Sequence, residues 1–138
     1  MRVSIIRALI SALTIIAAAL LVIFPRIIMP RLLGCDVPLA AVESGSMEPT
    51  IHIGDLILAE RPPRPLHEGD VIIFSRGGRL VVHRIIAVIQ QDGITLYRTK
   101  GDHNLLPDPA PVGESQVHGL VVIRIPLAGY LPLLFMRQ

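Results

Sequence analysis

Hydrophobic and polar residues are unevenly distributed along the chain, and the first part is the most apolar. Twenty-five of the first 35 residues are apolar, and the run from Val3 to Phe24 is apolar or small apart from Arg7. A helix over this run would rise about 33 Å, enough to cross the hydrocarbon core of a bilayer. The pattern predicts a membrane-spanning helix that Pro25 ends, with Arg26 at the far interface.

A cleaved signal peptide is the competing interpretation of this part. Its apolar region would span about 7–15 residues and end at a small-x-small site. Here the run is longer and ends in Ile23-Phe24-Pro25-Arg26, a poor cleavage site. Residues 1–35 are therefore interpreted as an uncleaved anchor with a juxtamembrane segment. Arginines on both sides leave its orientation open.

Residues 36–126 are predicted to form a β-rich domain. Short apolar and β-branched runs follow one another about 10–15 residues apart, with turn residues between them and no helical period. We expect strands over residues 38–43, 56–59, 71–74, 80–90, 94–99 and 117–125. Proline-rich stretches at 61–65 and 107–111 are expected to be loops. The fold class is mainly β, a small β-barrel or paired sheets.

The final part, residues 127–138, is again apolar. Arg124, Pro126, Gly129 and Pro132 argue against a regular membrane-spanning helix through residues 119–135. We expect an apolar tail that rests in the membrane interface, with a second membrane-spanning segment as the alternative.

Composition and charge sharpen this division. The chain is 51% hydrophobic and 17% charged, whereas soluble domains are about a quarter charged. The net charge of +2 conceals two basic ends and a middle that carries all eleven acidic residues. Scattered arginines with few aromatic residues argue against nucleic-acid binding. Cys35 is the only cysteine, so an intramolecular disulfide and a thiolate zinc site are excluded.

Candidate chemistry begins at Ser44-Gly45-Ser46-Met47-Glu48-Pro49-Thr50. Gly45 permits an unusual turn, in which a hydroxyl and backbone N–H groups converge on one point. A serine nucleophile with an oxyanion hole needs that arrangement. Taken alone, the same residues are typical of an ordinary turn.

A nucleophilic serine also needs a base, and His83 is the main candidate. It lies in an apolar strand and shares a face with Val81 and Ile85, where an ionisable side chain needs a partner. Asp102 and Asp108 lie six residues apart in a later loop and offer carboxylates to orient it. Taken singly, a structural histidine and two solvated acids are the alternatives.

Read together, these segments resemble the type I signal peptidases (peptidase family S26). The resemblance rests on the serine box, two Gly-Asp pairs before strands, His83-Arg84 inside a strand, and Gly101-Asp102-x-Asn104, all in the family's order. Bacterial members usually have Lys-Arg where this chain has His83-Arg84. The chain is therefore most similar to the endoplasmic-reticulum/archaeal branch, which includes some bacterial sporulation-type enzymes.

The resemblance implies a role for each matching residue. Ser46 corresponds to the nucleophile and His83 to the general base. Asp108 corresponds to the essential acid and Asp102 to a supporting one. Ser44 matches a hydroxyl that helps to form the oxyanion hole beside the Ser46 N–H. The family fold is an all-β catalytic domain tethered by an N-terminal membrane helix, and neither a cofactor nor a metal is expected.

The chain departs from the family pattern at His103, where relatives usually have asparagine. This second imidazole leaves open His103 as the base, or a metal site formed by His83, His103 and an aspartate. Lys100, the only lysine, raises the possibility of a Ser/Lys dyad. Because it lies in the acidic box and not in the base box, we expect it to pair with a neighbouring acid.

The resulting hypothesis is a membrane-bound serine endopeptidase that removes signal peptides from secretory precursors, cutting after small residues. Its expected partners are preproteins and the lipid bilayer, with the secretion translocon as a candidate. Its expected location is the cell membrane, single-pass, with the catalytic domain on the extracytoplasmic side. The alternatives are a catalytically silent peptide-binding β module on a membrane tether and a self-cleaving repressor-type Ser/Lys protease.

Overall fold

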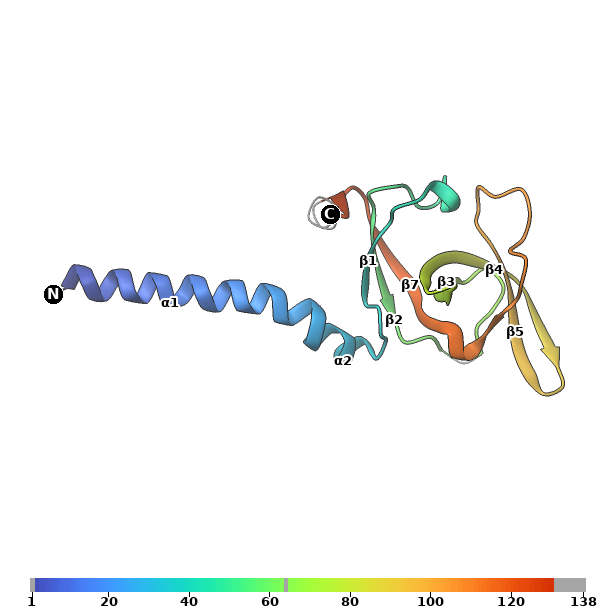
Figure 1. The fold of residues 1–138 in the computed structure, drawn as a ribbon, viewed down its shortest axis with the longest axis horizontal. Coiled ribbons are helices and arrows are strands. Elements are labelled where there is room, and N and C mark those ends of the chain that lie inside the picture. Colours follow the sequence, from blue (N-terminus) through green and yellow to red (C-terminus); the bar gives the residue numbers. More distant parts are fainter. Residues whose placement is uncertain (1, 64, 131–138) are drawn as a thin grey trace.

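The fold was examined in a computed structural model that describes residues 2–63 and 65–130. The chain begins with helix α1 (Arg2–Ile23), continues through a π-helical turn (Phe24–Ile28) and ends its helical part with α2 (Met29–Leu33). Figure 1 shows α1 extending away from a strongly curled sheet. The predicted tail lies mainly beyond residue 130, outside the described residues.

Helix α1 ends at Ile23, close to the predicted end at Pro25, but the helical path continues past the proline as a π-turn and α2, which the sequence did not predict. Proline lacks the N–H of an ordinary helical bond, and the chain shifts here to the i→i+5 pattern of a π-turn. The Met29 N–H donates to Phe24 O, five residues earlier. The helical part ends at Gly34, which has a φ of 62° and occupies the left-handed region where glycine is favoured.

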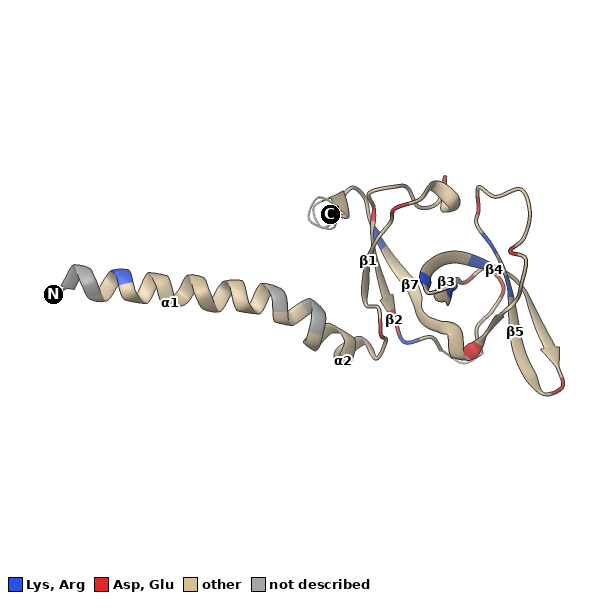
Figure 2. Cartoon of the chain, viewed as in Figure 1, with Lys and Arg blue, Asp and Glu red and all other residues tan. Residues whose placement is uncertain are grey.

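The helix predicted over residues 3–24 is present as α1. Arg7 is the charged residue among the described side chains of α1, and Figure 2 shows most of the charged residues on the β part. Over the described residues, no helix combines the length and apolar character that crossing a membrane requires. The membrane-spanning role of α1 remains a prediction.

The β part is one antiparallel sheet of seven strands, in the order β1-β2-β7-β3-β4-β5-β6. The strands are β1 (Leu39–Ala41), β2 (Leu56–Glu60), β3 (Val71–Arg76), β4 (Arg79–Gln91), β5 (Ile94–Lys100), β6 (Val112–Gly113) and β7 (Val117–Ile125). Every predicted strand is present. The sequence did not predict β6, which follows the proline-rich loop.

The sheet is curled but open. Strands β1 and β6 stand at its two ends, and within the described part of the chain they do not pair with each other. The predicted barrel or paired sheets are therefore replaced by a single sheet with a free edge at β1. Register shifts in the β2–β7, β3–β7 and β4–β5 pairings accompany the curl, since bulges increase local twist.

Two hydrophobic clusters form the core on the two faces of this sheet. On β3, Ile72 and Phe74 belong to one cluster and Ile73 to the other, as strand alternation requires. All three side chains are fully buried. Ile72 lies opposite His83 in the β3–β4 register, so the candidate base belongs to the face of Ile72 and Phe74.

Asp55 is a buried carboxylate that ties the start of β2 to the end of β7. Its Oδ2 accepts a hydrogen bond from the His52 N–H and forms an ion pair with Arg124, and its Oδ1 accepts a hydrogen bond from the Leu127 N–H. Burial raises its pKa, but these donors outweigh burial and hold the pKa below its ordinary value.

We expect Asp55→Asn to lower the free energy of unfolding by about 2 kcal/mol at pH 7. The pKa of Asp55 is lower in the folded chain, so the carboxylate stabilises the fold above the unfolded pKa of about 4. That contribution is lost as pH falls through the folded-state value. Urea unfolding of the full chain in detergent at pH 7 and at pH 3 measures both effects. Asp92→Asn, in the exposed β4–β5 turn, is the control, and equal stabilities at pH 7 would contradict this role.

Candidate active site

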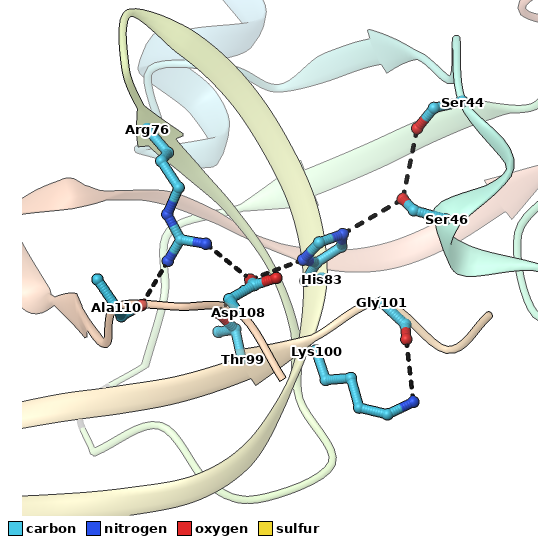
Figure 3. A network of polar contacts seen from close by, with 9 residues as sticks. All are labelled: Ser44, Ser46, Arg76, His83, Thr99, Lys100, Gly101, Asp108 and Ala110. Atoms are coloured by element: carbon cyan, nitrogen blue, oxygen red, sulfur yellow. Dashed lines mark hydrogen bonds and ion pairs between the residues drawn. The ribbon is translucent and has the colours of Figure 1, made fainter. Parts of the chain in front are cut away.

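Three separate segments bring the predicted catalytic residues together. Ser46 lies in a 3₁₀ turn (Gly45–Met47) shortly after β1, and His83 lies in the interior of β4. Asp108 lies in the loop after β5, and its N–H donates to Thr99 O at 2.8 Å. Figure 3 shows their side chains converging beside the long curved strand β4.

The three side chains form a continuous hydrogen-bonded chain. His83 Nδ1 lies 2.7 Å from Asp108 Oδ2, and His83 Nε2 lies 3.3 Å from Ser46 Oγ. If Nδ1 donates to the carboxylate, Nε2 is left as an acceptor for the Ser46 hydroxyl. The His83 side chain is 9% exposed, so this acceptor faces the serine with little competing water.

Asp108 is held as a carboxylate by two hydrogen bonds and one ion pair on the same oxygen. Besides His83, its Oδ2 accepts a hydrogen bond from Thr99 Oγ1 at 2.7 Å and lies 3.0 Å from an Arg76 guanidinium nitrogen. Burial raises the pKa of Asp108, but the hydrogen bonds from His83 and Thr99 and the neighbouring positive charge hold it below its ordinary value. Asp108 is thus negatively charged at neutral pH, as the partner of a base must be.

Ser44 lies on the other side of the nucleophile candidate. Its Oγ is 3.3 Å from Ser46 Oγ (Figure 3). With the Ser46 hydroxyl donating to His83, the Ser44 hydroxyl is the donor of this pair. A hydroxyl donor and the Ser46 N–H are thus available on one short turn, in line with the predicted oxyanion hole, whose role stays a prediction.

Asp102 lies outside this chain and pairs with the neighbour of His83 in sequence. Its two oxygens accept from Arg84 Nε at 2.9 Å and from an Arg84 terminal nitrogen at 2.7 Å. The Arg84 hydrogen bond is the main reason why the pKa of Asp102 lies below its ordinary value. Arg84 also donates to Gly69 O at 2.8 Å. Asp102 therefore braces the loop after β5 against β4.

That loop packs tightly against the serine and the histidine. A Cβ on Gly101 would lie 2.5 Å from Ser46 O and 2.9 Å from His83 Nε2, so glycine is required for this close approach. The His103 N–H donates to Ser46 O at 2.9 Å, while the His103 side chain is exposed. The structure therefore brings His83, and not His103, to the serine hydroxyl.

Within the described part of the chain, Lys100 is not in direct ion-pair contact with an acid, although its charge helps to lower the pKa of the neighbouring Asp102. Its Nζ donates to the carbonyl oxygens of Gly101 and Asn104, at 3.2 and 2.6 Å. These bonds close the loop on itself and leave no Ser/Lys dyad. Over residues 2–63 and 65–130, no group of three histidine, cysteine or acidic side chains is placed to hold a metal ion. The alternative site of His83, His103 and an aspartate is thus not formed there.

A groove of about 1300 Å³ runs along β1 to the serine and histidine, and most of the exposed lining is apolar. Its lining includes β1, Met47 and Ile51 together with residues 79–83 of β4. The Ala59 N–H donates to Pro38 O and the Val42 N–H to Asp55 O. Alternation along β1 therefore directs the backbone polar groups of residues 39 and 41 away from β2, toward the free edge.

Sequence reasoning missed Thr99 and Arg76 as neighbours of Asp108. Thr99 reaches the carboxylate because the chain folds back from β5, and Arg76 comes from the end of β3. Neither stands in a motif that marks a catalytic residue. The Arg84–Asp102 pair could have been found from the sequence, since both residues belong to segments that carry the family resemblance, His83-Arg84 and Gly101-Asp102-x-Asn104.

Comparison with known proteins agrees with this geometry. Residues 30–107, more than half of the chain, match the Peptidase S24-like family. The chain is 35% identical over 107 residues to the signal peptidase complex catalytic subunit SEC11 of Yarrowia lipolytica, covering 70% of this chain and 62% of that protein.

Two further relatives come from a bacterium and a mammal. Signal peptidase I W of Bacillus subtilis is 42% identical over 82 residues, covering 57% of this chain and 43% of the relative. Human signal peptidase complex catalytic subunit SEC11C is 39% identical over 89 residues, covering 62% and 46%. The chain thus matches less than two thirds of the length of each relative. The resemblance to signal peptidases is confirmed as sequence similarity.

Proposed function

The chain belongs to the Peptidase S24-like family, and we propose that it is a serine endopeptidase that removes signal peptides from secretory precursors. The observation that carries this proposal is the hydrogen-bonded chain from Ser46 through His83 to Asp108 beside an apolar groove. The proposed substrate class follows from its similarity to proteins named as signal peptidases.

In the proposed reaction, Ser46 Oγ attacks the carbonyl carbon of the scissile peptide bond while His83 Nε2 accepts the hydroxyl proton. Asp108 keeps the imidazole oriented and stabilises its positive charge. The Ser44 hydroxyl and the Ser46 N–H donate to the oxyanion. His83 then protonates the leaving amine, which releases the mature protein, and water hydrolyses the signal-peptide ester on Ser46 with His83 again acting as base.

The precursor is proposed to bind in extended form along the free edge of β1. The backbone groups of Leu39 and Ala41 face that edge, so an added strand would find hydrogen-bond partners there. The peptide would then run along the groove toward Ser46. Shallow apolar pockets would accept only small side chains at the first and third positions before the cut.

Helix α1 is proposed to hold the enzyme in the cell membrane, with the β domain on the extracytoplasmic side. Its large apolar side chains are exposed and surround the helix: Ile5, Ile6, Leu9, Ile10, Leu13, Ile15, Ile16, Leu20, Leu21 and Ile23, each at least 42% exposed. Exposing such an apolar surface to water is unfavourable, and burying it in the apolar interior of a bilayer is favourable. Confinement to one membrane would raise the effective concentration of enzyme and precursor, and the secretion translocon is a candidate partner.

Cleavage of a secretory precursor by the full chain in detergent tests this proposal. We expect a cut after an Ala-x-Ala sequence at the end of the signal peptide, located by mass spectrometry of the products. Replacing the last alanine by phenylalanine should lower the rate about 100-fold or more, because a bulky ring does not fit a shallow pocket. The same replacement two residues after the cut is the control. Equal cleavage of all three precursors, or none of any, would contradict the proposal.

A further inference from the structure

Arg76 connects the β3–β4 hairpin to the segment that carries Asp108. It is the last residue of β3, before the tight turn at Gly77 and Gly78, which have φ of 56° and 76°. One guanidinium nitrogen lies 3.0 Å from Asp108 Oδ2. Another donates to Ala110 O at 2.7 Å, so the guanidinium bridges the carboxylate and the backbone two residues later (Figure 3).

The segment that carries Asp108 has few backbone N–H groups that could hold it in place. Residues 107–111 read Pro-Asp-Pro-Ala-Pro, and prolines have no backbone N–H to donate. The backbone is tied to the strands by the Asp108 N–H, which donates to Thr99 O, and by Ala110 O, which accepts from Arg76. A side-chain donor therefore supports a carboxylate whose own loop has few backbone donors.

The guanidinium itself is held in place by an aromatic ring. Its central carbon lies 4.9 Å from the centroid of the Phe74 ring, within the range of a cation–π contact. Phe74 is fully buried and meets the His83 ring edge-on at 6.2 Å between centroids. Phe74 thus contacts both the guanidinium and the imidazole, on the face of the sheet that carries the site.

We propose that Arg76 is a positioning residue of this active site, whose guanidinium fixes the Asp108 carboxylate for His83 by bridging Asp108 and Ala110 while stacked on Phe74. This inference rests on the proposed function, since it assigns Arg76 a part in the same hydrolysis. Among the described residues, Arg76 is not one of those that line the groove, and no hydrogen bond joins it to Ser46. Its effect should therefore fall on the chemical step and not on precursor binding.

The test compares Arg76→Gln and Arg76→Lys in the full chain in detergent, with precursor cleavage measured at several concentrations. We expect Arg76→Gln to lower kcat about 30-fold with KM within about twofold, since small misplacements of catalytic groups cost about this much. Arg76→Lys should lose only about fivefold, because lysine keeps the charge but lacks the planar fork that reaches both oxygens. Arg98→Gln, at an exposed position on β5, controls for loss of an arginine.

Several outcomes would overturn the inference. One is a kcat within twofold of wild type in Arg76→Gln, and another is an Arg76→Lys variant no more active than Arg76→Gln. Rates are expressed per folded molecule, from thermal unfolding of each sample. If Arg76→Gln does not fold, a wild-type kcat in Arg76→Lys overturns it and a fivefold loss supports it. Ser46→Ala, measured in parallel, separates the two proposals: retained cleavage there overturns the proposed function itself.

Discussion

Replacing Ser46 with alanine should lower the rate of precursor cleavage by about 10⁴-fold or more. The hydroxyl is the group that forms the ester in the proposed reaction, and His83 Nε2 lies 3.3 Å from it. Without this hydroxyl, only the oxyanion donors and precursor binding remain, and in serine proteases these supply only a small part of the rate enhancement. Rates from gel or mass-spectrometric assays with purified protein in detergent measure the loss.

Two matched substitutions interpret this result. Ser44→Ala removes a hydroxyl two residues away and should cost about 10²-fold, the range seen when one oxyanion donor is lost. Ser115→Ala, at an exposed position in the 3₁₀ turn Glu114–Gln116, should leave cleavage unchanged. A Ser46→Ala variant that cleaves as fast as Ser115→Ala would exclude Ser46 as nucleophile.

The second large effect should separate the two aspartates. Asp108→Asn should lower kcat about 10⁴-fold, because the amide offers His83 Nδ1 a donor as readily as an acceptor and so supports the wrong tautomer. Asp102→Asn should cost only about tenfold. Asp102 accepts from Arg84 at 2.7 and 2.9 Å and acts on the loop beside the site, not on His83 directly. Steady-state kinetics of both variants on one precursor makes the comparison.

Equal losses in the two variants would contradict this division of labour. A larger loss in Asp102→Asn would indicate that Asp102, and not Asp108, orients His83. Thermal unfolding of both proteins shows whether either loss comes from a smaller folded fraction. The substitutions are matched in shape and charge, so the contrast reports position alone.

Much of the fold was predictable where strand signals are local. The β-branched run predicted over residues 80–90 forms β4, which is one residue longer at each end, and the strand predicted over residues 117–125 has the same bounds as β7. Alternation also placed His83 on the face of Ile85 correctly, since Ile85 lies in the cluster of that face. These predictions depend on neighbours in sequence, and a strand pattern records those directly.

Features that depend on long-range pairing were not predictable. The open edge at β1 depends on which strands pair across the whole sheet. Strand β6 has only two residues and forms by pairing with β5. Pro25 changed the hydrogen-bond pattern of the helix where the sequence indicated an end. In each case tertiary context or a rare backbone pattern decided between locally similar alternatives.

The candidate site divides in the same way. Ser46, His83 and Asp108 were named from motifs, and the structure brings them within hydrogen-bond distance in that order. Thr99 and Arg76 were not, because their approach to Asp108 depends on the loop after β5 and on the end of the β3–β4 hairpin. Residues that support a catalytic group through such contacts leave no mark in a single sequence.

In the proposed reaction, Ser46 forms the covalent bond to the signal peptide. Rapid acid quenching of the full chain with a precursor, followed by proteolysis and mass spectrometry, tests it directly. We expect an ester between Ser46 Oγ and the carboxyl-terminal residue of the signal peptide, present in the wild-type chain and missing in Ser46→Ala. An ester on another residue, or precursor cleavage by Ser46→Ala at the wild-type rate, would contradict it.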